Sequence, residues 1–260
     1  MSANDRGVWR KLVSPLLFIA AWWAVSEMGW MPDWFLPSPI KVVQALYSMT
    51  ISGELLHHTA MSMYRAMMGY FLAAFVGIAL GLLIAWSIYV EDFFDPIIEL
   101  LRPLSTFALV PVFFLWFGIG DVSKILIIFK SCFFPIVLNT IAGIKGVDNK
   151  LVKAAQSLGA NGRQIWLRVL IPAAMPMIIT GLRISTAMSM MALVGVEMIS
   201  SESGLGFLVI DAQRIFETDR MFAGIIVLSL IGFSLDQCAR VIQNRVVSWH
   251  IQTSLGGANT

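Results

Sequence analysis

The stretch AMMGYFLAAFVGIALGLLIAWSIYV, residues 66–90, carries no charged side chain and is long enough to cross a lipid bilayer. A bilayer core of about 30 Å requires about 20 mostly apolar helical residues for each crossing. The rest of the chain agrees in composition, because 58% of its 260 residues are hydrophobic and 13% are charged. Soluble domains average about 25% charged residues. The sequence therefore predicts an integral membrane protein.

Outward from residues 66–90, the chain contains five more apolar segments with few charges. We therefore expect an all-α integral membrane protein with six transmembrane helices. The expected spans are Val13 to Trp30, Ala66 to Val90, Pro103 to Gly120, Ile125 to Ile144, Met177 to Ser200 and Phe222 to Ile242. Isolated charges inside spans usually face the interior of a bundle. Several of these segments contain such charges, which favours a bundle over separate anchors.

The segment between the first two spans is rich in proline, with Pro32, Pro37 and Pro39. An amphipathic stretch follows these prolines and runs through Leu55 and Leu56. Prolines mark turns, and an amphipathic stretch of this kind is typical of a helix that lies in the membrane interface. A short interfacial helix therefore fits this segment better than a further crossing.

Lysine and arginine indicate the orientation of the chain, because cytoplasmic loops carry an excess of both. Basic residues concentrate near the amino end, between the fourth and fifth spans, and near the carboxyl end. With six spans these three segments lie on one side, so both termini are expected to be cytoplasmic. We assign Arg65 and Lys124 to loops on the opposite side, where bases are fewer and mixed with acids.

The segment VDNKLVKAAQSLGANGRQIWLRVLIP, residues 147–172, is too polar to cross the membrane. Asp148 is expected to cap the amino end of a helix of about ten residues. Leu151, Ala154, Ala155 and Leu158 follow the spacing of one apolar helix face, and Gly159 is placed to end the helix in the left-handed conformation. The small alanines leave room for another protein surface to approach this helix closely.

The same segment resembles a known signature. The run from Lys153 to Gly159, then nine residues, then Val169-Leu-Ile-Pro172, is similar to the EAA motif of permease subunits in binding-protein-dependent ABC importers. Three further segments are similar to the nitrate, sulfonate, taurine and bicarbonate branch of that family. They are SMYRAMMGYFLAAFVGIALG from Ser62, RPLSTFALVPVFFLWFGIG from Arg102 and GVEMISSESGLGFLV from Gly195.

This resemblance implies a type I ABC importer permease with the MetI-like fold, located as a multi-pass protein in the bacterial inner membrane. It also implies three kinds of protein partner: two ATPase subunits that bind ATP and Mg²⁺, a second permease copy, and a periplasmic solute-binding protein. By the same resemblance, residues 145–172 form a coupling loop that docks on the ATPase. The docking residues implied are Lys153, Ala154, Ala155, Ser157, Leu158, Gly159 and Pro172.

The chain departs from the signature at Lys153, where the family motif has glutamate. Any ionic contact made by that carboxylate is absent or reversed here, and Lys153 either meets an acidic residue of the ATPase or faces solvent. On this reading, residues 1–63 hold the first span and a periplasmic or interfacial segment, residues 64–250 form the permease core, and residues 251–260 are a flexible tail.

Three charged residues in the spans are candidates for the translocation path of a small solute, which the resemblance indicates is an anion. Lys130 is the cation of most interest for an anionic cargo, whereas Arg183 lies where a long side chain reaches the headgroups. Glu197 fits either the path or the cap of a neighbouring helix. An ion-driven secondary transporter or channel is the alternative function, with Lys130 and Glu197 as its coupling charges.

Other chemistry is excluded by what the sequence lacks. Two distant cysteines and three histidines do not provide the spacing of a metal site, and no GxxxxGK[ST] motif is present for ATP. We therefore expect no catalytic residue, no metal and no cofactor in this chain, and the near balance of charge argues against nucleic acid. Gly77 and Gly81 are spaced as GxxxG, which indicates a close helix contact within the subunit or with a second copy.

Overall fold

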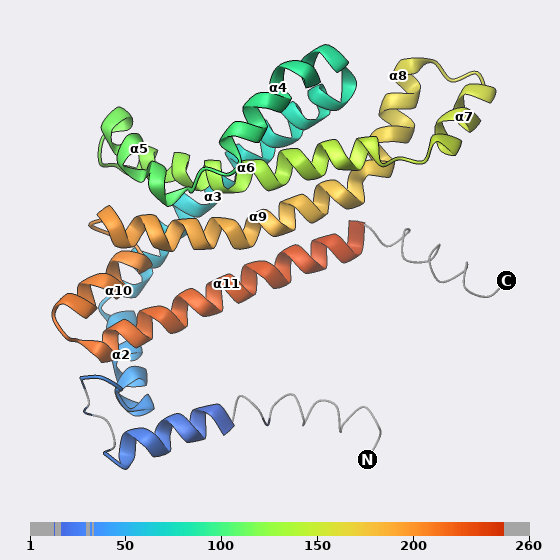
Figure 1. Cartoon of the computed structure of the whole chain (residues 1–260). Coiled ribbons are helices and arrows are strands. Elements are labelled where there is room, and N and C mark those ends of the chain that lie inside the picture. The colour runs from blue at the N-terminus through green and yellow to red at the C-terminus, as the bar shows by residue number, and fades with distance from the viewer. Residues whose placement is uncertain (1–12, 14–16, 30–31, 33, 247–260) are drawn as a thin grey trace, which may run out of the picture. The chain divides into compact units, whose positions relative to one another are not determined.

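The computed structural model describes residues 13, 17–29, 32 and 34–246, and these residues form helices without any strand. Figure 1 shows the helices in chain order. After the apolar helix Leu17–Glu27, they are α2 (Pro39–Ile51), α3 (Glu54–Trp86), α4 (Ile88–Leu101), η1 (Phe107–Leu109), α5 (Val110–Phe117), α6 (Asp121–Lys145), α7 (Asn149–Ser157), α8 (Gly162–Ile165), η2 (Trp166–Leu170), α9 (Ile171–Ser200), α10 (Leu205–Arg214) and α11 (Thr218–Val246). The expected tail 251–260 and the basic amino end lie outside the described residues.

Four helices of the described chain are long and apolar enough to cross a membrane: α3, α6, the continuous segment Gly162–Ser200, and α11. Two shorter apolar helices, Leu17–Glu27 and Phe107–Phe117, lie in the other two expected spans. The second of these is short because Gly118 adopts φ 77° directly after α5 and ends it. The expected all-α membrane architecture is confirmed. Four of the expected spans contain long helices, and the other two contain shorter ones.

The boundary between the interfacial segment and the second span differs from the expectation. The amphipathic stretch ends at Ile51, and Gly53 at φ 77° separates α2 from α3. Helix α3 then starts at Glu54 and runs 33 residues to Trp86, which is about 50 Å at 1.5 Å per residue. Ser87 breaks the helix, so the second span ends before the expected Val90.

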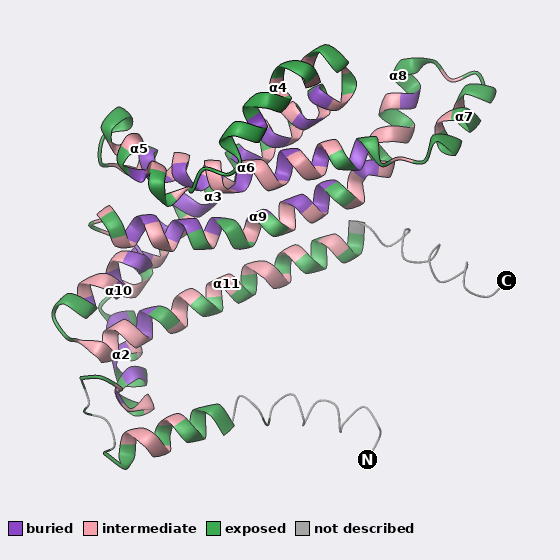
Figure 2. Cartoon of the chain, in the orientation of Figure 1, coloured by how far each residue is buried: buried purple, intermediate pink, exposed green. Residues whose placement is uncertain are grey.

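The chain divides into two compact units. The first unit comprises Met1–Ser62 and Ser201–Ser229, and the second comprises Met63–Ser200 and Leu230–Thr260. In the second unit α6 and α9 run side by side (Figure 1), and buried residues cluster along them (Figure 2). The sequence division at residue 63 stays a prediction.

Glycines bring three helices of the second unit into close contact. A Cβ atom placed on Gly69 would meet the Ile128 side chain at 2.7 Å, and one on Gly81 would meet Thr140 at 2.7 Å. Helix α3 therefore packs on α6 within the subunit, which decides between the two alternatives for this glycine motif. On the other side of α6, a Cβ on Gly181 of α9 would approach Asn139 to 2.7 Å. Only glycine permits helix backbones to lie this close.

Candidate functional site

The loop 145–172 contains the helix expected from the sequence. Helix α7 spans Asn149–Ser157, and the Asp148 side chain accepts a hydrogen bond from the backbone N–H of Lys150 at 2.8 Å. This bond satisfies one of the amide groups that a helix start leaves without an intrahelical partner. The predicted amino-terminal cap is therefore confirmed.

The carboxyl end of α7 closes as a Schellman motif around Gly159. Gly159 adopts φ 79° and donates its backbone N–H to the Gln156 carbonyl at 2.9 Å. Ala160 donates to the Ala155 carbonyl at 3.0 Å. These two bonds are the pair that defines the motif, and the left-handed conformation favours glycine at that position. The predicted cap at Gly159 is confirmed.

The apolar side of α7 is uncovered within the described chain. Leu151 is 51% exposed and Leu158 is 89% exposed, and no residue of α7 is buried. Lys153, Ala154 and Ser157 are exposed as well, and Figure 2 shows α7 in the exposed and intermediate colours. A helix with an uncovered apolar face suits contact with another protein.

The loop continues through a second capped helix into the long helix α9. Asn161 and Gln164 form a capping box, in which each side chain accepts the other residue's backbone N–H at 2.9 and 3.0 Å. Trp166 packs edge-to-face on Trp86 at the end of α3, with ring centroids 4.7 Å apart. The π-helical turn Trp166–Leu170 lies just before Pro172, whose ring obstructs a regular α-helical ladder.

The Lys130 side chain lies in a cavity of about 490 Å³ in the second unit. Its ammonium group donates to the Leu104 carbonyl and to the Thr106 hydroxyl, the latter at 3.3 Å, and lies 5.8 Å from the centre of the Phe134 ring. The other lining residues are Arg102, Leu104, Ser105, Thr106, Ser131, Phe134, Pro135, Leu138, Asn139 and Met188. We call this space the Lys130 cavity.

Glu197 lies in a buried group of charges that the sequence did not indicate. Arg65 donates to Glu197 at 2.8 Å and to Asp121 at 2.7 Å, while Lys124 lies 4.0 Å from Asp121. Arg65 is 2% exposed and Glu197 is fully buried. We call these four residues the Arg65 cluster. The assignment of Arg65 and Lys124 to loops was wrong, because both lie inside helices and are buried.

Arg183 is bound to α11 of the same unit. Its guanidinium lies 3.4 Å from the Asp236 carboxylate and donates to the Gln243 side chain at 3.0 Å. Asp236 also pairs with Arg240 at 3.3 Å, as their i, i+4 spacing indicates. Arg183 therefore joins a polar group between helices, and the expectation that it reaches the headgroups stays a prediction.

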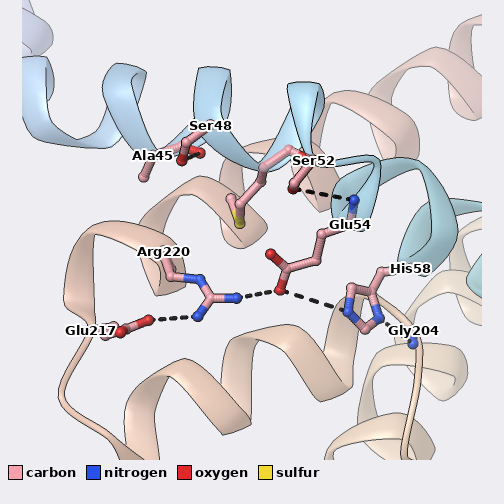
Figure 3. Close-up of polar contacts among 9 residues, drawn as sticks. Ala45, Ser48, Ser52, Glu54, His58, Gly204, Glu217 and Arg220 are labelled. Carbon is pink, nitrogen blue, oxygen red and sulfur yellow. Dashed lines mark hydrogen bonds and ion pairs between the residues drawn. The ribbon is translucent and has the colours of Figure 1, made fainter.

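A further polar network belongs to the first unit and is drawn in Figure 3. Arg220 donates to Glu217 at 2.6 Å and also to Glu54, while the His58 ring nitrogen accepts the backbone N–H of Gly204 at 3.0 Å. Gly204 precedes α10 and has no side chain for capping. His58 thus supplies an acceptor at the start of α10, a structural role that adjacent histidines in the sequence did not suggest.

No group of three or more metal-ligating side chains occurs among the described residues. Cys132 is fully buried in the second unit, and Cys238 is exposed and unbonded. The candidate sites among the described residues are the uncovered helix α7 and the Lys130 cavity.

Residues 54–248 match the family described as the inner membrane component of binding-protein-dependent transport systems. The chain belongs to this family. The taurine transport system permease protein TauC of Escherichia coli (strain K12) is 39% identical over 241 residues, which cover 90% of this chain and 87% of that protein. The nitrate import permease protein NrtB of Leptolyngbya laminosa is 33% identical over 218 residues, which cover 80% of this chain and 78% of that protein.

A chain of the MetNI methionine ABC transporter, solved in inward facing conformations, shares the fold with a TM-score of 0.64 at 15% sequence identity. The likeness covers 76% of this chain and 98% of that one. The importer family and the type I permease fold expected from the sequence are thus confirmed. This permease is a multi-pass membrane subunit and not itself an enzyme, because ATP hydrolysis in such importers belongs to a separate subunit.

Proposed function

We propose that this permease pairs with a second copy to form the translocation path of an ATP-driven importer for a small oxyanion. Two ATPase subunits would bind ATP and Mg²⁺, and a solute-binding protein would deliver the cargo from outside. The chain would lie in the bacterial inner membrane with both termini in the cytoplasm and would hold no cofactor itself. The names of TauC and NrtB support an oxyanion, since taurine carries a sulfonate and nitrate is itself one.

Coupling to the ATPase is assigned to the loop 145–172. The observation that carries this proposal is a preformed helix α7, capped at both ends, with Leu151 and Leu158 uncovered. A rigid element loses little conformational entropy on docking, which favours binding. Lys153, Ala154, Ala155, Ser157, Leu158 and Gly159 would form the docking surface, and Pro172 would set the exit into α9.

Motion would pass from this loop to the spans through short contacts. Trp166 follows α7 and α8 and packs on Trp86 of α3, while the segment Gly162–Ser200 continues without interruption into α9. When the two ATPase subunits close on ATP, the two α7 helices would move with them, and the spans would alternate between outward and inward openings. An ion-driven transporter is disfavoured, because the Glu197 charge is already paired with Arg65.

The test of this proposal is Gly159→Val in the complete complex. Valine at φ 79° is strained by about 1–2 kcal/mol. It also adds a branched side chain where the loop must meet its partner, since Gly159 has open space around it. We expect the ATPase subunits to be retained 5 to 30 times less well, roughly the factor for this energy, and uptake to fall accordingly. Co-purification and ATP-driven uptake into proteoliposomes measure both.

Gly53→Val is the matched control. Gly53 has φ 77° and nothing within 4 Å of an added Cβ, but it lies between α2 and α3, far along the sequence from the loop. The control carries the same backbone strain and should retain the ATPase. Wild-type uptake and stoichiometry in Gly159→Val, or equal losses in both variants, would refute the assignment of the loop.

A further inference from the structure

Two cavities of the second unit differ in what they offer an anion. One, of about 290 Å³, is lined by α3, α9 and α11, and its lining is apolar except for a few groups. Arg183 is the one charged side chain among its described lining residues, and Asp236 and Gln243 already bind it. An anion entering that cavity would have to displace a carboxylate from Arg183. The Lys130 cavity imposes no such requirement.

The Lys130 cavity holds two cations and no carboxylate among its described lining residues. Lys130 and Arg102 provide the positive charge, and Ser105, Thr106 and Ser131 provide hydroxyl groups. Its volume of about 490 Å³ is of the size usual for small-molecule sites, about 300 to 1,000 Å³. Cations together with hydroxyl donors are what an oxyanion needs in place of its hydration shell.

The ammonium group of Lys130 keeps hydrogen-bonding capacity for a ligand. It has three donors, and the described chain uses two of them, for the Leu104 carbonyl and the Thr106 hydroxyl. Both partners are neutral, so the positive charge is not cancelled. The two bonds fix the position of the ammonium and leave one donor available.

The cavity borders an uncovered face of α9 at Met188. Met188 lines the cavity and is exposed. At 3.6 residues per turn, it shares one side of α9 with other exposed apolar residues. These are Met177, Ile184, Met191 and Ile199. An open apolar face beside a cationic cavity is the arrangement expected where a second copy would enclose a path.

We infer that the Lys130 cavity is an oxyanion-binding station on the transport path, with Lys130 and Arg102 as its charged groups. This inference rests on the proposed import function and adds the site at which the cargo binds. The oxygens of a small sulfonate or nitrate-like anion would accept there from the ammonium, the guanidinium and the hydroxyls. Binding there must be weak enough for release, which agrees with a lining of two cations and three hydroxyl groups that does not enclose the anion with charges on every side.

The experiment uses charged thiol reagents on Ser131→Cys in a Cys238→Ser background. Cys132 can stay, because it is fully buried. The full chain is placed in phosphatidylcholine nanodiscs and labelled with 2-sulfonatoethyl methanethiosulfonate, an anion, or with its trimethylammonium counterpart, a cation. The ratio of the two rates reports the potential in the cavity. Any change in thiol reactivity affects both reagents alike and cancels in this ratio.

Lys130→Met should lower the anion-to-cation ratio about tenfold, equivalent to about 1.4 kcal/mol, because the lost unit charge attracts the anionic reagent and repels the cationic one, so both rates move the ratio in the same direction. Lys130→Arg should preserve the ratio, and the control Lys41→Met, which removes an exposed lysine of α2, should leave it unchanged. Sodium methanesulfonate should slow labelling in the parent and not in Lys130→Met.

Two outcomes would overturn the inference. An unchanged ratio in Lys130→Met would show that the Lys130 charge produces no positive electrostatic potential in the cavity. Protection by anionic phosphatidylglycerol in the disc, with none by methanesulfonate, would assign the cavity to lipid headgroups. Labelling needs neither ATP nor partner subunits, so it can fail while ATP-driven uptake is normal, and uptake can fail while labelling behaves as expected. Failure of this inference and failure of the proposed function are therefore distinguishable.

Discussion

The Arg65 cluster and the Lys130 cavity lie in the same helical unit and treat their cations in opposite ways. Arg65 is almost fully buried and donates to the carboxylates of Glu197 and Asp121. Lys130 is only partly buried, and its hydrogen-bond partners are a carbonyl and a hydroxyl. In the first case protein carboxylates neutralise the charge, and in the second the charge persists.

This difference separates structural charges from charges that serve a ligand. A buried pair costs much to desolvate, and once formed it is costly to break, so it holds α3, α6 and α9 in one arrangement. A cation with neutral partners keeps a positive potential in its surroundings, which attracts anions. Sequence alone placed Lys130 and Glu197 together as candidate path residues, and their partners distinguish them.

The strongest test of this comparison is Glu197→Met. It removes the carboxylate that the buried Arg65 contacts at 2.8 Å, and breaking a buried pair costs about 3 kcal/mol or more. We expect a lower yield of monodisperse protein and a lower unfolding temperature in detergent. The double variant Arg65→Met/Glu197→Met should recover part of the loss. Wild-type unfolding with abolished uptake would instead make Glu197 a path residue.

Lys130→Met should show the reverse pattern. The charge loss removes two hydrogen bonds to neutral groups, but Lys130 is only partly buried and water can replace the ammonium, so stability should fall by about 1–2 kcal/mol. Uptake of taurine or nitrate in proteoliposomes, whichever the complex carries, should fall about tenfold, equivalent to 1.4 kcal/mol. Lys130→Arg should restore uptake. A destabilisation as large as that of Glu197→Met would remove the contrast between the two regions.

Asp121→Asn probes the half-exposed edge of the Arg65 cluster. The Asp121 side chain is 39% exposed, so water screens its contacts with Arg65 and Lys124. The amide oxygen of asparagine can still accept from Arg65, and the expected loss is about 1 kcal/mol or less. Thermal unfolding at low and high salt measures it. A loss equal to that of Glu197→Met would mean that burial does not determine the energy of these pairs.

Arg183→Met should have the smallest effect on stability. Arg183 and Asp236 are 33% and 40% exposed in their side chains and lie 3.4 Å apart. Pairs of this kind contribute about 0.2–1 kcal/mol. A double-mutant cycle with Asp236→Asn isolates the interaction from its neighbours. A coupling energy above about 2 kcal/mol would place this pair with the Arg65 cluster and not with surface pairs.

Local features of this protein could be predicted from the sequence. The cap at Asp148 and the left-handed turn at Gly159 depend on residues within one or two turns of each other. Such interactions follow from backbone geometry and residue type. The uncharged run 66–90 likewise predicts a span, because the bilayer sets a minimum length for an apolar segment that crosses it, although the helix itself runs from Glu54 to Trp86. These features needed no knowledge of the tertiary fold.

The Arg65 cluster could not be predicted in this way. Arg65 and Glu197 are 132 residues apart in the chain, and only the packing of α3 on α6 and α9 brings them together. Arg65 precedes the uncharged run by one residue, which suggested a loop, whereas α3 begins eleven residues earlier at Glu54. The sequence does show an arginine next to a long apolar run, and such an arginine needs an acidic partner if it is buried. It does not show which distant acid is that partner.

The glycine contacts described above have a mechanical consequence. Between most helices, side chains act as a compliant layer that absorbs small displacements. At Gly69, Gly81 and Gly181 one of the two facing helices contributes no side chain to that layer, and its backbone lies directly against a residue of α6, where an added Cβ would clash. A displacement of α9 would therefore be transmitted to α6 and α3 with little reduction in its size, and the three helices would tilt together as one rigid body. The amplitude of the conformational change would then be set by how far this rigid body tilts, with little contribution from bending of its helices.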